Sequence, residues 1–544
     1  MNDLMERKHK FIELFSGCGG MSLGLEAAGF ELFMANELSP MAGETFAFNL
    51  IGENLQLLAD RNSKSGKVLW IKSQYSDRDL RGRLRENPGD FNNGHYSDLN
   101  ENTNFSGKLI IGDIDSLLNY VESNPKILRK LKQQNIDLLS GGPPCQGFSM
   151  AGKRIKDDHK NILPLSFAKF AGSIQPKVIL LENVKGITSP FTTEDNVKHY
   201  AWLETAKAFS MEGFYPICML VNSKYFGVPQ NRPRFILMAF RDDIFKQLKR
   251  SKYQSDKVKQ IIINSSSFYN KVHENRSDLN KIRLTDLPLY SIEKSRVLFN
   301  GELLPQLPKI RNDFIFVSDA IGDIASVEKE YFLNTIRNDY AINLTHLFRK
   351  KPFCSENKLL NHEYRKHNFK VKARFRLYQI LSKSNGLRAE VMKIISGTNG
   401  EQDTIREVFD LLKEEKFLFL SPEGSEVLRP PENISSFKEY LRHIGSRKHS
   451  QRALRFDEPA PAQMTIPDDL CHYSPDQLRT LTVREMARIQ SFPDWFVFRS
   501  KITTGGNQRN FEVPQYTQVG NAVPPLLAYE LGKTIKRILK NTTK

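Results

Sequence analysis

Short apolar runs alternate with amphipathic segments along the first 243 residues of the chain. Seven of these runs are rich in Val, Ile, Leu and Phe, and their lengths are typical of buried strands. They span residues 11–15, 32–36, 109–112, 136–140, 178–182, 215–221 and 235–240. Helical periodicity fills several intervals, at residues 21–28, 40–49 and 199–211. The alternation predicts an α/β fold built on a mostly parallel, doubly wound sheet.

Two long segments interrupt this pattern. Residues 52–108 are polar and rich in Asn, Asp, Arg and Gly, so we interpret them as an insertion at the edge of the sheet. From residue 244 to about residue 450 the alternation disappears, which predicts a second, irregular domain. Regularity returns in two helices, predicted over residues 482–490, with a Thr482–Glu485 capping box, and over residues 525–540.

Composition excludes several classes of protein. The chain has 544 residues, too many for one simple core, and its formal net charge is +17. Residues 341–393 hold 13 Lys or Arg against 3 Asp or Glu, interleaved with aromatic side chains, a pattern suited to a polyanion or to a solvated basic surface. The five cysteines are scattered, without a CxxC pair, which argues against a disulfide framework or a structural zinc site. The absence of a signal-like segment or a long apolar stretch predicts a cytoplasmic protein that does not enter membranes.

One cysteine occupies a special position in this pattern. The strand predicted over residues 136–140 is followed by two glycines, by Pro143 and Pro144, and then by Cys145. Ligands and reacting groups of open α/β sheets lie at the carboxyl ends of the strands, and the prolines stiffen the backbone that presents the thiol. A small buried thiol is the alternative, because most lone cysteines are buried hydrophobic residues.

The first strand leads into a glycine-rich turn that contains Gly17, Gly19 and Gly20. Glu37 ends the second strand, where a carboxylate accepts hydrogen bonds from ribose hydroxyls, and Asp113 follows the third strand. The third glycine of the dinucleotide fingerprint is missing, since Ser22 stands there, so a nucleoside site without a pyrophosphate cradle favours S-adenosylmethionine over NAD. Simple helix capping by the two acids is the alternative.

A second polar group is expected at the same edge of the sheet. Glu182 ends another apolar strand, and Gln230, Arg232 and Arg234 alternate along an extended segment, so they should face one side. Guanidinium groups suit carbonyl or phosphate oxygens. Read alone, Glu182 could equally be a structural cap, and the two arginines could be surface residues beside a strand.

Eight sequence blocks, in order, resemble the cytosine-C5 DNA methyltransferase family. They are FSGCGG at 15–20, NE at 36–37, GDI at 112–114, GPPCQGFS at 142–149, ENV at 182–184, QNRPR at 230–234, LTVREMARIQSFP at 481–493 and QVGNAVPP at 518–525. The blocks cover residues 11–240 and 451–535, so the middle of the chain is unmatched by motif. The resemblance implies a Rossmann-like methyltransferase sheet with a target-recognition domain, and an enzyme of the restriction-modification type.

The resemblance also implies a role for each matching residue. Cys145 would be the nucleophile that adds to C6 of a cytosine flipped out of the duplex, with Glu182 at N3 and the exocyclic amine, and Arg234 at O2, assisted by Arg232 and Gln230. S-adenosylmethionine would be the methyl donor, and no metal is expected. Its site would be lined by Phe15, Gly17, Gly19, Gly20, Glu37, Asp113, Ile114, Pro144, Asn521 and Val523. DNA contacts are expected from Gln146, Ser149, Lys153 and Arg154 in a closing loop, and from Arg374 and Arg376 in the basic window.

These implications define the expected organisation and partners. The catalytic domain would span residues 1–243, the recognition domain 244–450, the rest of the recognition region 451–514, and a returning segment 515–544. The partner would be double-stranded DNA, for a monomeric prokaryotic enzyme whose methylation protects host DNA from a cognate endonuclease. Two alternatives remain at this stage: a tRNA cytosine-C5 methyltransferase of the same architecture, and a catalytically silent DNA-binding homologue.

Overall fold

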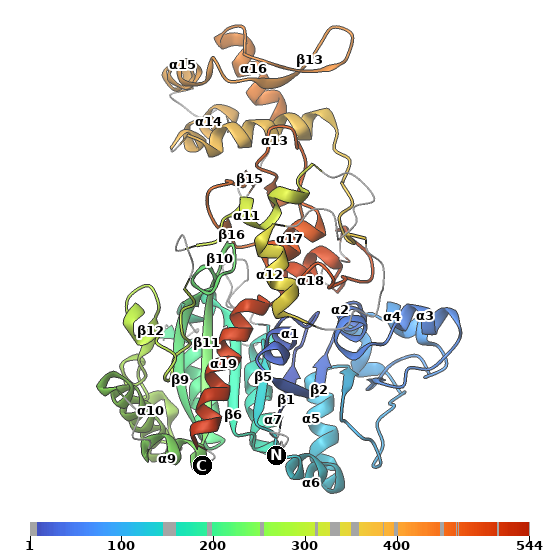
Figure 1. Cartoon of the computed structure of the whole chain (residues 1–544), viewed down its shortest axis with the longest axis vertical. Helices are drawn as coiled ribbons and strands as arrows, with labels where there is room; N and C mark the ends of the chain where they lie inside the picture. Colours follow the sequence, from blue (N-terminus) through green and yellow to red (C-terminus); the bar gives the residue numbers. More distant parts are fainter. Residues whose placement is uncertain are drawn as a thin grey trace, which may run out of the picture.

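A nine-stranded sheet forms the centre of the larger part of the molecule in this computed structural model (Figure 1). The structure describes residues 8–144, 159–192, 198–250, 255–309, 314–326, 338–349, 358–384, 386–396, 401–445, 451–463, 465, 467–506, 508 and 511–542. All seven predicted strands lie in the sheet, which confirms the α/β class. They are β1 (His9–Leu14), β2 (Phe30–Glu37), β4 (Lys108–Ile111), β5 (Leu138–Gly141), β6 (Val178–Val184), β9 (Phe214–Asn222) and β11 (Pro233–Arg241).

The strand order is β12-β9-β11-β6-β5-β1-β2-β4-β3, with β3 (Val68–Trp70) and β12 (Leu289–Ser291) at the two edges. Only β11 runs against its neighbours, so the sheet is mostly parallel, as predicted. From β1 the chain proceeds to β2 and β4 on one side, and then returns to β5 and β6 on the other. The order therefore reverses between β1 and β5, and such switch points open a crevice at the carboxyl ends of the strands.

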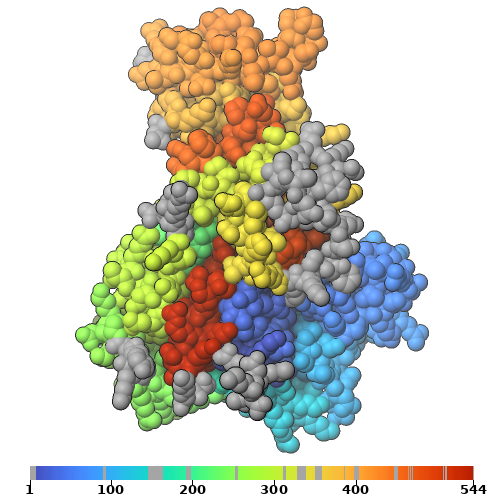
Figure 2. All heavy atoms as spheres, viewed as in Figure 1, coloured from blue at the N-terminus to red at the C-terminus, as the bar shows by residue number. Residues whose placement is uncertain are grey.

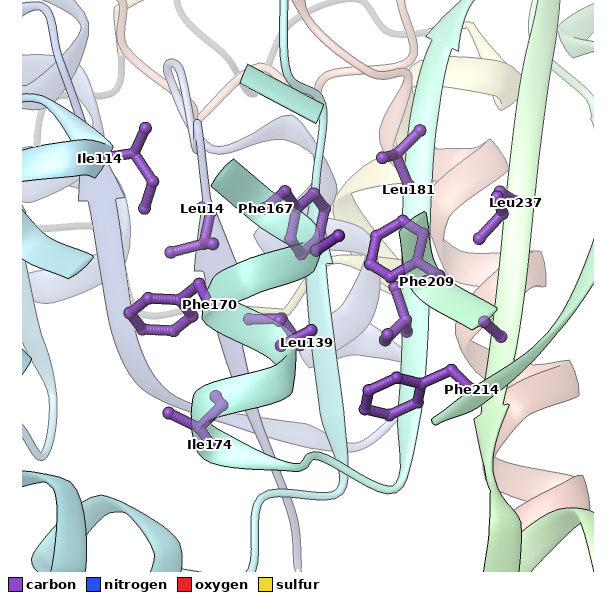
Figure 3. Close-up of a cluster of buried hydrophobic side chains, with 14 of the residues drawn as sticks. Leu14, Ile114, Leu139, Phe167, Phe170, Ile174, Leu181, Phe209, Phe214 and Leu237 are labelled. Carbon is purple, nitrogen blue, oxygen red and sulfur yellow. The ribbon is translucent and has the colours of Figure 1, made fainter. Parts of the chain in front are cut away.

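Helices cover both faces of the sheet and bury its apolar side chains. On one face, α5 (Ile114–Ser123), α6 (Pro125–Gln133), α7 (His159–Ile174) and α8 (Ala201–Met211) enclose the core. Figure 3 shows Phe167 and Phe170 of α7 beside Leu139 of β5, with Phe209 of α8 close to Leu181 of β6. On the other face, α1 (Gly20–Ala27) packs against α19 (Pro525–Thr542), so the end of the chain returns to its beginning.

Packing on the central sheet continues past the boundary predicted at residue 244. Helices α9 (Asp242–Arg250) and α10 (Asp256–Glu274) pack against the sheet, and β12 pairs with β9. The apolar side chains of α9 and of the first half of α10 join the same buried cluster as α1 and α19, which extends to Leu304. Phe268 and Val272 of α10 join the cluster that α5 to α8 enclose. The strand alternation ends near residue 244, but the core built on the sheet does not, because amphipathic helices following an antiparallel strand continue to cover the sheet.

The segment 52–108 lies at the sheet edge. It holds α3 (Leu55–Asp60), β3, α4 (Leu80–Arg85) and a 3₁₀ turn (Pro88–Asn93), and it follows α2 (Pro40–Phe46) and its π-helical continuation (Ala47–Ile51). Buried Arg83 forms a two-point ion pair with Asp98 and stacks its guanidinium 5.1 Å from the Trp70 ring centre. The segment is therefore anchored to the sheet by β3 and by this buried cluster.

A separate lobe stands at the far end of the molecule (Figures 1 and 2). It consists of α13 (Phe369–Ser382), α14 (Leu387–Ser396), α15 (Glu401–Leu412), α16 (Ile434–Ile444) and a hairpin of β13 (Phe417–Leu420) and β14 (Glu426–Arg429), with a hydrophobic core of its own. The elements between lobe and sheet are α11 (Val317–Ile321), α12 (Asp339–Leu347), β15 (Arg452–Ala453), β16 (Ala460–Pro461), β17 (Leu470–Cys471), α17 (Val483–Ile489) and α18 (Gln515–Asn521). Thr482 and Glu485 form the predicted capping box of α17. Within the described residues, no helix is long and apolar enough to cross a membrane.

Candidate active site

The glycine-rich turn after β1 is held by Glu37 at the end of β2. The Gly17 amide donates to Glu37 Oε2 at 2.8 Å, and the Ser39 amide donates to Oε1 at 2.8 Å. Phe15, Gly17 and Gly19 all have positive φ angles, of 54°, 55° and 98°, so the chain turns tightly at these positions. Burial raises the pKa of Glu37, against the lowering effect of these amide donors.

The returning C-terminal segment closes the same turn. A Cβ atom on Gly20 would lie 2.3 Å from the carbonyl oxygen of Val523, so this position requires glycine. Asn521, the last residue of α18, is exposed, while Val523 is buried. The packing therefore brings together two predicted cofactor segments that are 500 residues apart in the chain.

Asp113 caps α5 at the end of the neighbouring strand, β4. Its Oδ1 accepts a hydrogen bond from the Ser116 amide at 2.8 Å, which matches the capping alternative. Its Oδ2 is buried, and no partner for it is found in the described part of the chain. The Ser16 hydroxyl in the glycine-rich turn is likewise buried without a partner. Buried polar atoms are almost always hydrogen-bonded, so these two atoms can each accept or donate a bond to a polar ligand.

Glu182 and Arg234 form an ion pair at the carboxyl end of β6. Arg234 Nε lies 2.7 Å from Glu182 Oε1, and each residue is 8% exposed. Arg234 stands near the start of β11, which is antiparallel to β6, so the start of one strand lies beside the end of the other. Burial lowers the pKa of Arg234, and the Glu182 carboxylate opposes this effect.

The same edge anchors the segment that precedes Cys145. The Asn183 side chain donates to the Pro143 carbonyl at 2.8 Å. A Cβ atom on Gly142 would lie 3.2 Å from Glu182 Oε2, so the chain passes directly over the carboxylate. Cys145 itself lies outside the described residues, but the chain leading to it is fixed beside the Glu182–Arg234 pair.

Gln230 and Arg232 are completely enclosed next to this pair. Arg232 Nη2 donates to the carbonyl oxygens of Gly520 at 2.7 Å and Ala522 at 3.3 Å, and Nη1 donates to Gln230 Oε1 and to the Gln463 carbonyl. Arg232, the residue between β10 and β11, is thus bonded to the segment around Asn521. β10 (Gln230–Asn231) also pairs with β16 of the recognition region.

The family model of C-5 cytosine-specific DNA methylases matches residues 9–65 and 101–537. The chain belongs to this family. It is therefore a DNA (cytosine-5-)-methyltransferase, EC 2.1.1.37, and members of this family use S-adenosylmethionine. The unmatched residues 66–100 lie inside the segment 52–108.

Curated relatives of this C5 methyltransferase are similar over nearly their whole length. The type II methyltransferase M.DdeI of Desulfomicrobium norvegicum is 24% identical over 97% of this chain and 89% of its own. M1.HphI of Haemophilus parahaemolyticus is 24% identical over 98% and 87%. Among solved structures, one described as a DNA modification methyltransferase encoded within an E. coli prophage matches with a TM-score of 0.51 at 18% identity, covering 98% of this chain and 100% of that one, which supports the fold.

Several predicted site residues of the C5 methyltransferase are placed by the structure, and others are not. Cys145, Gln146, Ser149, Lys153 and Arg154 lie outside the described residues. Phe15, Gly17, Gly19, Gly20, Glu37, Asp113, Ile114, Pro144, Asn521 and Val523 all belong to segments that surround the carboxyl ends of β1, β2, β4 and β5 or close over the turn after β1.

The two arginines of the basic window that were predicted to contact DNA both lie in α13 and bond to neighbouring elements of the lobe. Arg376 is 6% exposed, and its Nε donates to the Lys416 carbonyl at 2.6 Å. Arg374 donates to the carbonyl oxygens of Ile444 and Gly445 at the end of α16. Both guanidinium groups bond to neighbouring elements of the lobe, Arg376 from a buried position and Arg374 from a half-buried one.

Two residues near the site were not predicted from the sequence. Asn183 lies in the quoted ENV block, and its neighbour Glu182 was the only member given a role. Gln463 lies in no block that we assigned, and only its contact with Gln230 and Arg232 in the folded chain reveals it.

Proposed function

We propose that this enzyme transfers the methyl group of S-adenosylmethionine to C5 of one cytosine within a specific double-stranded DNA sequence. The observation that carries this proposal is the buried Glu182–Arg234 pair, which stands beside the anchored segment leading to Cys145. A carboxylate and a guanidinium side by side match the N3 and O2 edge of a cytosine that has been flipped out of the duplex.

The reaction begins with the Cys145 thiolate. Its sulfur adds to C6 of the cytosine, and the electrons of the C5–C6 double bond make C5 nucleophilic. The positive charges of Arg232 and Arg234 favour the thiolate over the thiol. Glu182 hydrogen-bonds N3 and the exocyclic amine, and Arg234 binds O2, so the two residues stabilise the charge that the addition places on the ring. Loss of the C5 proton to a base then expels the thiolate after methyl transfer.

The residues around the glycine-rich turn fit S-adenosylmethionine, which supplies a methyl group on a positively charged sulfur. Asp113 Oδ2, buried and unpartnered, is an acceptor for an adenine amino group. Each Glu37 oxygen accepts one backbone amide and keeps a second lone pair for a ribose hydroxyl. Phe15, Ile114 and Val523 offer apolar surface, and Asn521 an exposed amide.

We further propose that the methylation protects host DNA against a cognate restriction endonuclease. Support comes from the names of the relatives, which are type II methyltransferases similar over nearly the whole chain. The large recognition region, with its independent lobe, favours duplex DNA over tRNA as substrate.

Expression in a host free of cytosine methylation tests this proposal. Genome-wide mapping of 5-methylcytosine should show methylation confined to one short sequence motif, and DNA from these cells should resist an endonuclease that cuts the motif. A purified-enzyme assay with duplex DNA and tRNA separates the substrates. Methylation of tRNA without methylation of DNA would overturn the proposal.

A further inference from the structure

Three touching residues have unused polar atoms at the seam where β10 pairs with β16. Gln463 Oε1 and Nε2, Gln230 Nε2 and Arg232 Nε are all buried, and none has a hydrogen-bond partner in the described part of the chain. Gln463 is 4% exposed, Arg232 2% and Gln230 fully buried. Sixteen described side-chain atoms are buried and unpartnered, and four of them belong to this one cluster. Such a concentration indicates a missing ligand, since each unpaired atom costs about 1–3 kcal/mol.

The cluster also carries an excess of positive charge. Burial and the nearby charge of Arg234 both lower the pKa of Arg232, and the Glu182 carboxylate acts on both arginines. Glu182 is already paired with Arg234, whereas the Arg232 contacts that the structure gives are to backbone and amide oxygens. A buried charge without a counterion is unfavourable, so an anion would be stabilised at this position.

We propose that Gln463, together with Gln230 and Arg232, binds the phosphodiester beside the target cytosine in the enzyme–DNA complex. This inference rests on the proposed function. Three of the four unused atoms are donors, and donors from one guanidinium and two amides suit the oxygens of a phosphate. These buried atoms then gain hydrogen-bond partners only when the nucleotide is bound.

A nucleotide can enter at the seam because few hydrogen bonds hold β16 and Gln463 against β10 and Arg232. β10 and β16 pair over only two residues each, Gln230 with Ala460 and Asn231 with Pro461. Beyond this pairing, the Gln463 backbone contacts are long, at 3.3 Å to Gln230 Oε1 and 3.4 Å to Arg232 Nη1. A small displacement of the recognition segment therefore exposes the cluster beside the Glu182–Arg234 pair, where the flipped base is proposed to lie.

Neutral DNA linkages test this assignment. The duplex carries the sequence motif that the enzyme methylates, with its target cytosine unmethylated. The phosphodiester on the 5′ or the 3′ side of that cytosine is replaced by a methylphosphonate. Methyl transfer is measured as kcat/KM for the wild type and for Gln463→Leu, which removes the amide but keeps similar bulk. Gln451→Leu is the matched control, because Gln451 is a buried glutamine of the same region whose amide is satisfied by Asp468 and Tyr378.

At one of the two linkages, the wild type and Gln451→Leu should lose tenfold or more in kcat/KM, whereas Gln463→Leu should lose less than threefold. Gln463→Leu should also keep or raise the melting temperature, since it removes unpaired buried atoms, while Gln451→Leu should lower it. Equal losses in all three proteins at both linkages would overturn the proposal, as would a lower melting temperature in Gln463→Leu, which indicates a bound water only. If the proposed function itself fails, the unmodified duplex is not methylated by the wild type.

Discussion

Arg234 Nε lies 2.7 Å from Glu182 Oε1 because antiparallel β11 begins where β6 ends. The pair is buried next to the segment that leads to Cys145. Under the proposed function, Glu182 and Arg234 meet a cytosine only after the base has left the duplex.

Replacement of Glu182 by glutamine should reduce methyl transfer by about 100-fold or more, because positioned acid–base and charge-stabilising groups contribute about 10²–10⁴-fold. The amide keeps the size of the side chain and can still accept from Arg234, so the protein should fold. Single-turnover kinetics with target duplex measure the effect. An unchanged rate constant in Glu182→Gln would remove this residue from the chemistry.

Replacement of Asp113 by alanine should raise the KM for S-adenosylmethionine by about tenfold, one hydrogen bond to a neutral donor being worth about 1 kcal/mol or more. Loss of the α5 cap should also cost about 1 kcal/mol of stability. Asn54→Ala is the control, because Asn54 caps α3 in the same way. It should lower stability without changing the KM, and an equal KM change in both variants would exclude a cofactor contact by Asp113.

Glu13 makes stability depend on pH. Burial raises the pKa of this carboxyl to about 8, although the Ser22 hydroxyl donates to it. A raised folded-state pKa means that the contribution to stability is full below the unfolded pKa of about 4.3 and is lost as pH rises through 8. The melting temperature of Glu13→Gln minus that of the wild type should therefore increase from pH 4 to pH 8. Above pH 8 this difference should stay constant. A gap that does not change with pH would contradict the assignment.

Replacement of Arg376 by alanine should destabilise the separate lobe by about 1–3 kcal/mol, since its guanidinium holds the Lys416 carbonyl in a buried position. The salt dependence of DNA binding should stay the same, because a residue that neutralises no phosphate releases no counterion. Thermal unfolding and binding titrations at several salt concentrations measure the two effects. A shallower salt slope in Arg376→Ala would restore this residue as a DNA contact.

The sequence predicted the central sheet well, for physical reasons. Buried parallel strands are continuous apolar runs, so all seven central strands are visible in the sequence. The edge strands β3 and β12 have three residues each and little pattern, so they were not predicted. The predicted end of the catalytic domain at residue 243 followed the loss of strands, whereas α9 and α10 still cover the sheet.

The site was partly predictable in the same way. Cys145, Glu182 and Arg234 stand at strand ends with distinctive neighbours, and the family motifs give them roles. Arg232 contacts the segment around Asn521, which is hundreds of positions away in the sequence. A local sequence pattern cannot predict such a contact. A lone glutamine such as Gln463 has no sequence signal, and basic composition does not show that Arg376 is buried against the Lys416 carbonyl.

Covalent trapping by duplex DNA with 5-fluorocytosine at the target position tests the central claim most directly. Fluorine at C5 cannot leave as a proton would, so the adduct with the enzyme persists after methyl transfer and survives denaturing electrophoresis. The wild type should form this adduct in the presence of S-adenosylmethionine, and Cys145→Ala should form none while still binding the duplex. An adduct that persists in Cys145→Ala would contradict the assignment of Cys145 as the nucleophile.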